Sequence, residues 1–117
     1  MKAIWNGVVI AEAPREELIY IEGNLYFPPS AINMEYFAAN DFHTTCPWKG
    51  EASYYDVEVN GSKNANGAWY YPQPKSGAIE KVKKDFKDYV AFWQGIIVEE
   101  KDFKDYVALW RGIIVEE

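Results

Sequence analysis

The chain has 117 residues, and 17% of them are aromatic. This length supports one hydrophobic core without metal or disulfide cross-links, and the single cysteine excludes an internal disulfide. Twelve basic and eighteen acidic residues give a net charge of -6, which repels phosphate backbones, so nucleic acid is not expected as a partner. Because the N-terminus lacks the long apolar run of a signal peptide or a membrane span, we expect a cytoplasmic protein that does not bind membranes.

Two hairpins are predicted in the first quarter of the chain. Residues 2–11 form two strand-like segments around Asn6-Gly7, and this dipeptide is the strongest short signal for a two-residue turn because both positions require positive φ. Residues 18–27 repeat the strand-turn-strand pattern, with the turn expected at Gly23-Asn24. The side chains of the second hairpin that are expected to face inward are those of Ile19 and Ile21.

The middle of the chain predicts one helix and a further hairpin. Ser30 is a suitable N-cap for a short helix over residues 31–37, which would pack against a sheet and end at Asn40-Asp41. Alternation over residues 52–59 then predicts a strand that turns back at Asn60-Gly61. We expect a lengthened connection after this turn, so that the returning strand begins only at Ala68.

The segment from residue 76 to residue 93 combines two patterns. Its apolar residues recur at helical spacing, whereas residues 89–93 have the composition of a strand. We expect a short helix near residues 78–84 followed by a strand, and Gln94-Gly95 is expected to close a hairpin. Together these elements predict a mostly β, α+β domain.

Two motifs carry the most distinctive side chains. The first is Thr44-x-Cys46-Pro47-Trp48-Lys49-Gly50-x-Ala52-x-Tyr54-Tyr55, and the second is Ala68-Trp69-Tyr70-Tyr71-Pro72-x-Pro74. Together they resemble the small bacterial family known as domain of unknown function 427, and the resemblance covers residues 1–100. It implies a single compact antiparallel domain, β-tent or barrel-like, that is built from hairpins with one or two short helices. Some members carry the label nucleotidyltransferase-like.

The aromatic side chains of the two motifs predict a pocket for a small-molecule ligand. They lie on the strands that flank Asn60-Gly61, so they can converge, and Lys49 would add a positive group at the rim. Such a cleft suits a small, flat or anionic ligand. The alternative is that these aromatics form a large core with tyrosine hydroxyls at the surface. The residues expected to bind the ligand are Trp48, Lys49, Tyr54, Trp69 and Tyr71.

An enzyme with Cys46 as its nucleophile is the second interpretation. A reactive thiolate needs a base and a depressed pKa, and His43 and Lys49 lie three residues before and after Cys46. On a regular strand His43 and Cys46 point to opposite faces, so their pairing needs a kink, which Pro47 would have to supply. Otherwise Cys46 is a small buried side chain. The candidate catalytic residues are therefore Cys46, Lys49 and His43.

Neither a metal nor another cofactor is predicted. One cysteine and one histidine leave a tetrahedral zinc site two ligands short. We find no Walker-type phosphate loop, and the nearest approach to a magnesium-binding pair is Asp56-x-Glu58, which is expected on the solvated face of a strand. A metal-dependent transferase is therefore not favoured.

Residues 84–100 are repeated as residues 101–117. The family pattern has this segment once, so two near-identical copies compete for one slot in the sheet. If the second copy took the slot, the first would bulge out as a loop at a cost on the order of 2–3 kcal/mol, so we expect the first copy to fill it. The two differences between the copies are Phe92 against Leu109 and Gln94 against Arg111.

The second copy, Lys101 to Glu117, carries too much apolar surface to remain in water. We expect it to add to the sheet edge of another protomer or to swap into a neighbour's slot, which gives a homodimer or a larger homo-oligomer. An extra hairpin folded back on its own sheet is the alternative. The third functional interpretation is accordingly a self-associating scaffold protein.

Overall fold

The computed structural model describes residues 1–93 and 95–99. Antiparallel strands and one short α-helix among these residues confirm the predicted mostly β, α+β class. No helix in this part of the chain has the length and apolar character needed to cross a bilayer. The elements are β1 (Lys2–Trp5), β2 (Val8–Glu12), β3 (Ile19–Ile21), β4 (Asn24–Tyr26), β5 (Phe37–Cys46), β6 (Gly50–Val59), β7 (Ser62–Tyr70), α1 (Ser76–Val82), β8 (Val90–Phe92) and β9 (Ile97–Glu99).

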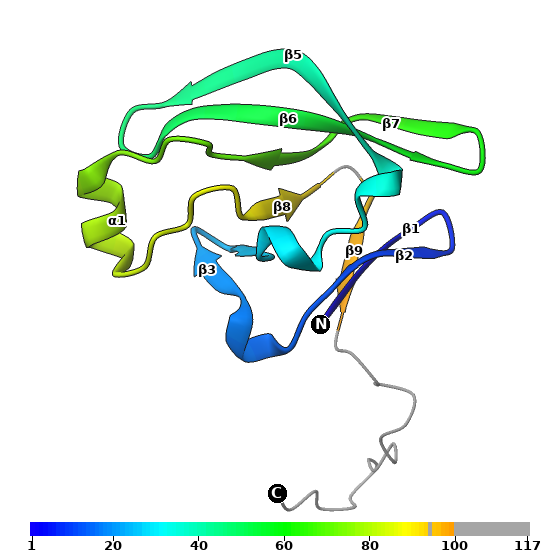
Figure 1. Ribbon diagram of the computed structural model, residues 1–117, viewed down its shortest axis with the longest axis horizontal. Coiled ribbons are helices and arrows are strands. Elements are labelled where there is room, and N and C mark those ends of the chain that lie inside the picture. Colours follow the sequence, from blue (N-terminus) through cyan, green and yellow to red (C-terminus); the bar gives the residue numbers. More distant parts are fainter. Residues whose placement is uncertain (94, 100–117) are drawn as a thin grey trace, which may run out of the picture.

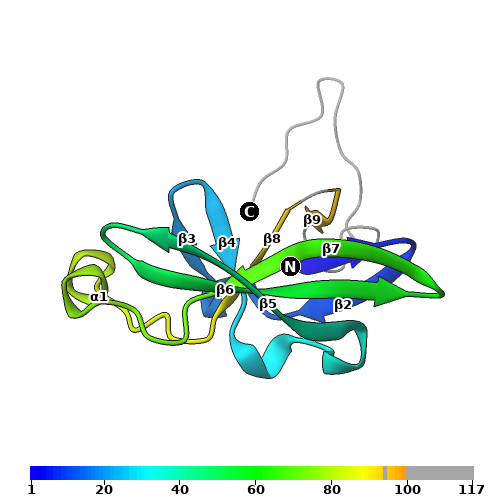
Figure 2. The same ribbon diagram turned by 90° about the horizontal axis from the view of Figure 1, so that it is seen from above.

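The described strands form three antiparallel sheets. Strands β5, β6, β7 and β8 are adjacent in that order and form the upper layer in Figure 1, whereas the hairpin β3-β4 and the sheet β2-β1-β9 lie below them. Figure 2 shows α1 at one end of the molecule and the β1-β2 turn at the other. Backbone hydrogen bonds between Phe27 and Val90 join the β3-β4 hairpin to the β8 edge of the large sheet.

Two buried clusters fill the space between the sheets. The larger one lies between the β1-β2 hairpin and the large sheet and contains Phe27, Phe37 and Val57. The second includes Ile19 and Ile21, which are buried as predicted. We call this second group the aromatic cluster. Its buried members are Ile19, Ile21, Tyr26, Ala52, Tyr54, Tyr71, Ala78, Phe86 and Ala91, and Cys46, Trp48, Trp69, Ile79, Val82 and Tyr89 pack against them.

Two-residue turns close hairpins at Asn6-Gly7 and Asn60-Gly61, as predicted. The β3-β4 turn is Glu22-Gly23, one residue earlier than predicted, because Ile21 pairs with Asn24. In each of these turns both residues have positive φ and glycine comes second, so the glycine takes a conformation that carries no steric cost for it. The earlier turn puts Glu22 at the tip of its hairpin.

The helix predicted over residues 31–37 is wrong. The structure has two single 3-10 turns, Pro29–Ala31 and Met34–Tyr36, and β5 begins directly after them. Between these turns Ile32 is extended, with φ -87° and ψ 129°, and it bridges to Ala11 of β2. Pairing with a distant strand therefore outweighs the local preference for helix.

The break predicted at Asn40-Asp41 is instead a register shift inside β5. Nδ2 of Asn40 donates to Oδ1 of Asp56 at 2.8 Å and to Oδ1 of Asn66 at 2.7 Å, so this side chain links β5 to the adjacent β6 and, beyond it, to β7. The backbone amide of Asn66 also donates to Asp56 at 2.9 Å, and this bond is the main cause of a lowered Asp56 pKa. Asp56 is thus half-buried rather than on a solvated face, and β7 starts before Ala68.

The helix and the strand predicted between residues 76 and 93 are observed as α1 and β8. The hairpin predicted at Gln94-Gly95 is wrong, because β9 pairs with β1 rather than with β8. Both β8 and β9 come from residues 84–100, so the first copy of the repeat fills the slot. We call the place that β8, β9 and the residues before them occupy the slot, and the segment in it connects the large sheet to the sheet β2-β1-β9.

The second copy, residues 101–117, lies outside the described residues, so its packing against another protomer stays a prediction. We expect the full chain to form a dimer or a larger assembly and a chain ending at Glu100 to be monomeric, because truncation removes the apolar side chains of the second copy. Light scattering of both chains at one concentration measures this difference. Two monomers would exclude the intermolecular packing.

Candidate functional site around Lys49

The structure brings the predicted ligand-binding aromatics into the aromatic cluster. Tyr54 on β6 lies opposite Trp69 on β7, and Tyr71 follows the end of β7. Tyr54 and Tyr71 are buried, whereas Trp48 and Trp69 are partly buried against them. These side chains therefore converge, and they form part of the core.

Lys49 lies buried within this cluster, not at its rim as predicted. The residue is 6% exposed, and its Nζ donates a hydrogen bond to Oε1 of Glu22 at 2.6 Å. The ammonium lies 5.4 Å from the ring centres of both Trp48 and Tyr71, within the range of cation–π attraction. The β5-β6 turn and the β3-β4 turn are therefore connected by the ion pair between Lys49 and Glu22, and a side-chain hydrogen bond from Trp48 to Glu22 adds to this connection.

The β5-β6 turn holds the start of the Lys49 side chain in place. Gly50 has φ 121°, and a Cβ atom at this position would lie 3.1 Å from the backbone oxygen of Gln73. The backbone nitrogen of Lys75 donates to the carbonyl oxygen of Lys49 at 3.0 Å. The turn is thus packed against residues 73–75, and a larger residue than glycine would push it away.

The ion pair holds Lys49 as a cation. Burial acts to lower the pKa of this amine, but the hydrogen bond to Glu22 and the phenols of Tyr26 and Tyr71 act in the opposite direction, and the net pKa is raised. The same hydrogen bond lowers the pKa of Glu22. A raised pKa disfavours the neutral amine that a nucleophile or a general base requires. Lys49 is therefore suited to binding an anion rather than to removing a proton.

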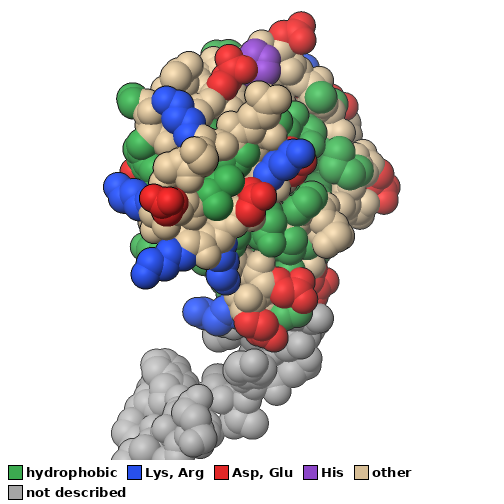
Figure 3. Space-filling model, turned by 60° about the vertical axis from the view of Figure 1, so that its left-hand side comes forward, with side chains coloured by type: hydrophobic (Ala, Val, Ile, Leu, Met, Phe, Trp, Pro, Cys, Tyr) green, Lys and Arg blue, Asp and Glu red, His purple; other side chains and the backbone are tan. Residues whose placement is uncertain are grey.

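Further lysines approach the same turn. Nζ of Lys81 on α1 lies 4.6 Å from the ring centre of Trp48, and Nζ of Lys75 donates to the carbonyl oxygen of Pro47 at 2.7 Å. Lys81 also contributes to the lowered pKa of Glu22. Figure 3 turns the α1 end of the molecule forward and shows hydrophobic side chains exposed among lysines and acidic residues. Two lysines besides Lys49 therefore lie close to this turn.

Sequence reasoning did not identify two members of the site, Glu22 and Tyr26. Tyr26 is fully buried, its hydroxyl accepts a hydrogen bond from Nε1 of Trp69 at 3.1 Å, and burial raises its pKa. The other two-residue turns, Asn6-Gly7 and Asn60-Gly61, have glycine second, and by the same pattern Glu22-Gly23 places Glu22 at a turn tip. The sequence has no signal that this tip meets Lys49.

The structure separates His43 from Cys46, whereas Cys46 and Lys49 both lie against the aromatic cluster. Cys46 lies opposite Gly50 and is partly buried against the aromatic cluster. His43 is exposed opposite Ser53, and its Nδ1 lies 3.2 Å from Oγ of Ser53. Because β5 pairs with β6 without interruption from His43 to Cys46, these two side chains point to opposite faces of the strand. The kink that a His–Cys pair requires is not present in β5.

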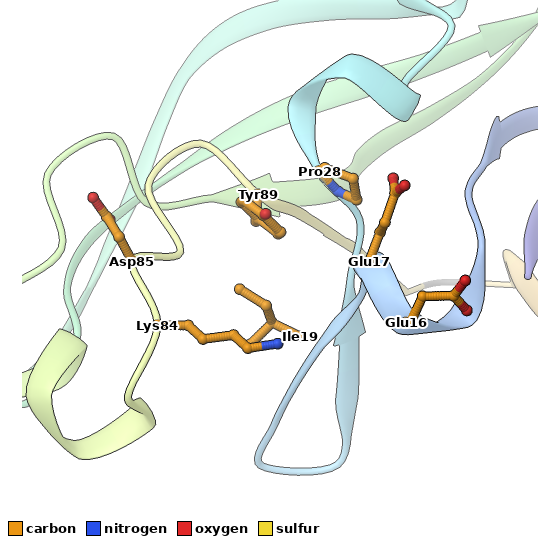
Figure 4. Close-up of a pocket in the computed structure, with 7 residues that line it drawn as sticks. All are labelled: Glu16, Glu17, Ile19, Pro28, Lys84, Asp85 and Tyr89. Carbon is orange, nitrogen blue, oxygen red and sulfur yellow. The ribbon is translucent and has the colours of Figure 1, made fainter.

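A cavity of about 470 Å³ lies beside the aromatic cluster rather than at Lys49. Figure 4 shows its two glutamates on one side and side chains from the segment after α1 on the other. Its charged groups are exposed and of both signs, so it offers fewer fixed polar groups than the Lys49 site. Residues 1–93 and 95–99 hold no group of three His, Cys, Asp or Glu side chains suited to a metal ion. The cavity is lined by Glu16, Glu17, Ile19, Pro28, Lys84, Asp85 and Tyr89.

Comparison with known proteins identifies a family but no activity. The sequence matches, over residues 1–108, the family described as domain of unknown function (DUF427). No match is found among the curated proteins. The matched range contains both sequence motifs and every residue of the site described above.

Proposed function

Because the chain belongs to the DUF427 family, whose description assigns no activity, we propose a function from the geometry of its own site. The domain binds a small molecule that carries an anionic group and a flat ring, and the anionic group binds to Lys49. The observation that carries this proposal is the buried ammonium of Lys49, whose carboxylate partner Glu22 comes from an exposed turn.

In this proposal Glu22 occupies the place of the ligand's anionic group. The Glu22 side chain is 55% exposed and that of Lys49 is 8% exposed, so the carboxylate can move into solvent while the ammonium stays in the core. A buried ammonium without a partner is costly, which means that the site favours an anion at all times. A ligand carboxylate or phosphate competes with Glu22 for the same donor.

The ring of Trp48 accounts for the flat part of the ligand. Its centre lies 5.4 Å from Nζ of Lys49 and, unlike the buried Tyr71, it is partly exposed, so a ring attached to the bound anion can stack on it. Lys81, which lies against Trp48, adds a second positive charge near the site. This local charge is required because the net charge of -6 repels anions at longer range.

A thermal-shift screen of carboxylate- and phosphate-bearing metabolites tests the proposal. The wild type is compared with Lys49→Met, which removes the charge and keeps the apolar stem, and with Lys87→Met at an exposed lysine as the control for net charge. We expect a ligand with an anion and a ring to stabilise the wild type and Lys87→Met but not Lys49→Met. In Glu22→Gln the same ligand should bind about tenfold more tightly, because the competing charge is gone.

Three other outcomes of the screen would contradict or change the proposal. An equal shift in the wild type and Lys49→Met would contradict the proposed site. Loss of binding in Glu22→Gln would show that Glu22 helps to hold the ligand rather than competing with it. A screen without any binder would favour the scaffold interpretation.

A further inference from the structure

The first copy of the repeat connects three parts of the fold. β8 pairs with β7 and β9 pairs with β1, so residues 84–100 join two sheets (Figure 1). Before β8, Phe86 is fully buried in the aromatic cluster, with its ring centre 6.4 Å from that of Tyr26 and 5.8 Å from that of Tyr71. The fold therefore requires a segment that pairs with β7 and β1 and fills the position of Phe86.

Residues 101–117 carry the side chains that the slot requires. Every buried residue of the first copy recurs in the second at the same spacing, with one exception in β8. The counterparts of the buried residues are Phe103 for Phe86, Val107 for Val90 and Ala108 for Ala91, and the exposed or partly buried β9 residues Ile97, Val98 and Glu99 correspond to Ile114, Val115 and Glu116.

The exception is Leu109, which stands where the first copy has Phe92. The ring centre of Phe92 lies 5.5 Å from that of Phe27 and 6.0 Å from that of Phe37. Leucine fills part of this space and keeps it apolar, so the second copy fits the slot with a small loss of packing.

We propose that residues 101–117 are a second occupant of this slot in their own chain. When they enter it, residues 84–100 become an inserted loop of 17 residues after α1. Such a loop lowers the folding equilibrium constant by roughly 70-fold, which is why the first copy is the occupant in the wild type. At micromolar protein concentration the tethered copy outcompetes one from another molecule, because its effective concentration is on the order of millimolar. The second copy enters the slot when a substitution prevents the first copy from packing there.

Matched aspartate substitutions test the proposal in the full chain. Phe86→Asp places a carboxylate in the fully buried position of the first copy, and Phe103→Asp makes the same change in the second. Without a second occupant, Phe86→Asp should lower the folding equilibrium constant by at least about 10⁴-fold. With it, the loss is limited to about 10²- to 10³-fold, which is the cost of the loop and of leucine for phenylalanine.

We expect Phe103→Asp to stay close to the wild type, Phe86→Asp to lose about 10²- to 10³-fold in the folding equilibrium constant and the double variant to lose at least about 10⁴-fold, as measured by urea melts followed by near-UV circular dichroism. In Phe86→Asp the methyl NMR signals of Leu109 should shift upfield, because they approach the rings of Phe27 and Phe37. A loss of about 10⁴-fold or more in Phe86→Asp alone, a double variant no less stable than Phe86→Asp, or an unfolded Phe103→Asp would each overturn the proposal. So would a Phe86→Asp that folds only at high concentration as a dimer, since the occupant would then come from a neighbour.

Discussion

Tyr26→Ala is expected to lower the free energy of unfolding by about 3–5 kcal/mol. The side chain is fully buried, and its ring makes edge contacts with Trp69 at 6.2 Å and with Phe86 at 6.4 Å. Truncation would leave a cavity where the β3-β4 hairpin meets the large sheet, and the surrounding rings cannot close it without leaving their own contacts.

Two further variants separate the ring of Tyr26 from its hydroxyl. Tyr26→Phe keeps the ring but leaves Nε1 of Trp69 without its acceptor, so it should cost about 1 kcal/mol. Tyr20→Ala, at a 70% exposed position of the same hairpin, is the control and should change stability by less than about 0.5 kcal/mol. Urea melts measure all three. Equal losses for Tyr26→Ala and Tyr20→Ala would contradict the position of the hairpin against the sheet.

Stability is expected to fall steeply as the pH rises above about 10, the ordinary pKa of tyrosine. Burial, followed by the neighbouring Tyr26, raises the pKa of Tyr71 to about 12, and burial with the nearby Tyr70 does the same for Tyr55. Between pH 10 and pH 12 the unfolded chain therefore loses these protons while the folded chain keeps them. Each tyrosine should contribute a slope of up to about 1.4 kcal/mol per pH unit.

Lys49 contributes to the same alkaline loss. Its folded pKa is raised, so its stabilising effect is complete below the unfolded value of 10.5 and is lost as the pH rises through the folded value. Glu22 affects stability at acidic pH. Its pKa is lowered from 4.5, so its contribution to stability is present above pH 4.5 and is lost on acidification. The contributions of Glu22, Lys49, Tyr55 and Tyr71 should therefore all be present between about pH 5 and pH 10.

Tyr71→Phe tests the alkaline prediction. This variant removes one titrating phenol from the core, so the fall in urea midpoint between pH 10 and pH 12 should be shallower than in the wild type. Tyr20→Phe, which removes an exposed phenol, controls for the loss of one tyrosine and should keep the wild-type slope. Parallel curves for Tyr71→Phe and the wild type would mean that Tyr71 does not couple to alkaline unfolding.

Features with a local cause could be predicted from the amino-acid sequence. Positive φ at Asn6-Gly7 and Asn60-Gly61 is a property of the turn residues themselves, and the mostly β class follows from the alternating segments beside such turns. The repeat of residues 84–100 is also visible without any structure. The convergence of the aromatics on β6 and β7 follows from a single turn between the two strands.

Contacts between distant segments could not be predicted from the sequence and were seen first in the tertiary structure. Residues 31–37 have a helical pattern, but pairing between Ile32 and Ala11 makes them extended at that point. The strand after Gly95 pairs with β1, at the opposite end of the chain. The partner of Lys49 is 27 residues away in another hairpin. Such contacts depend on how whole hairpins pack, and burial of apolar surface is non-directional, so no local sequence signal specifies them.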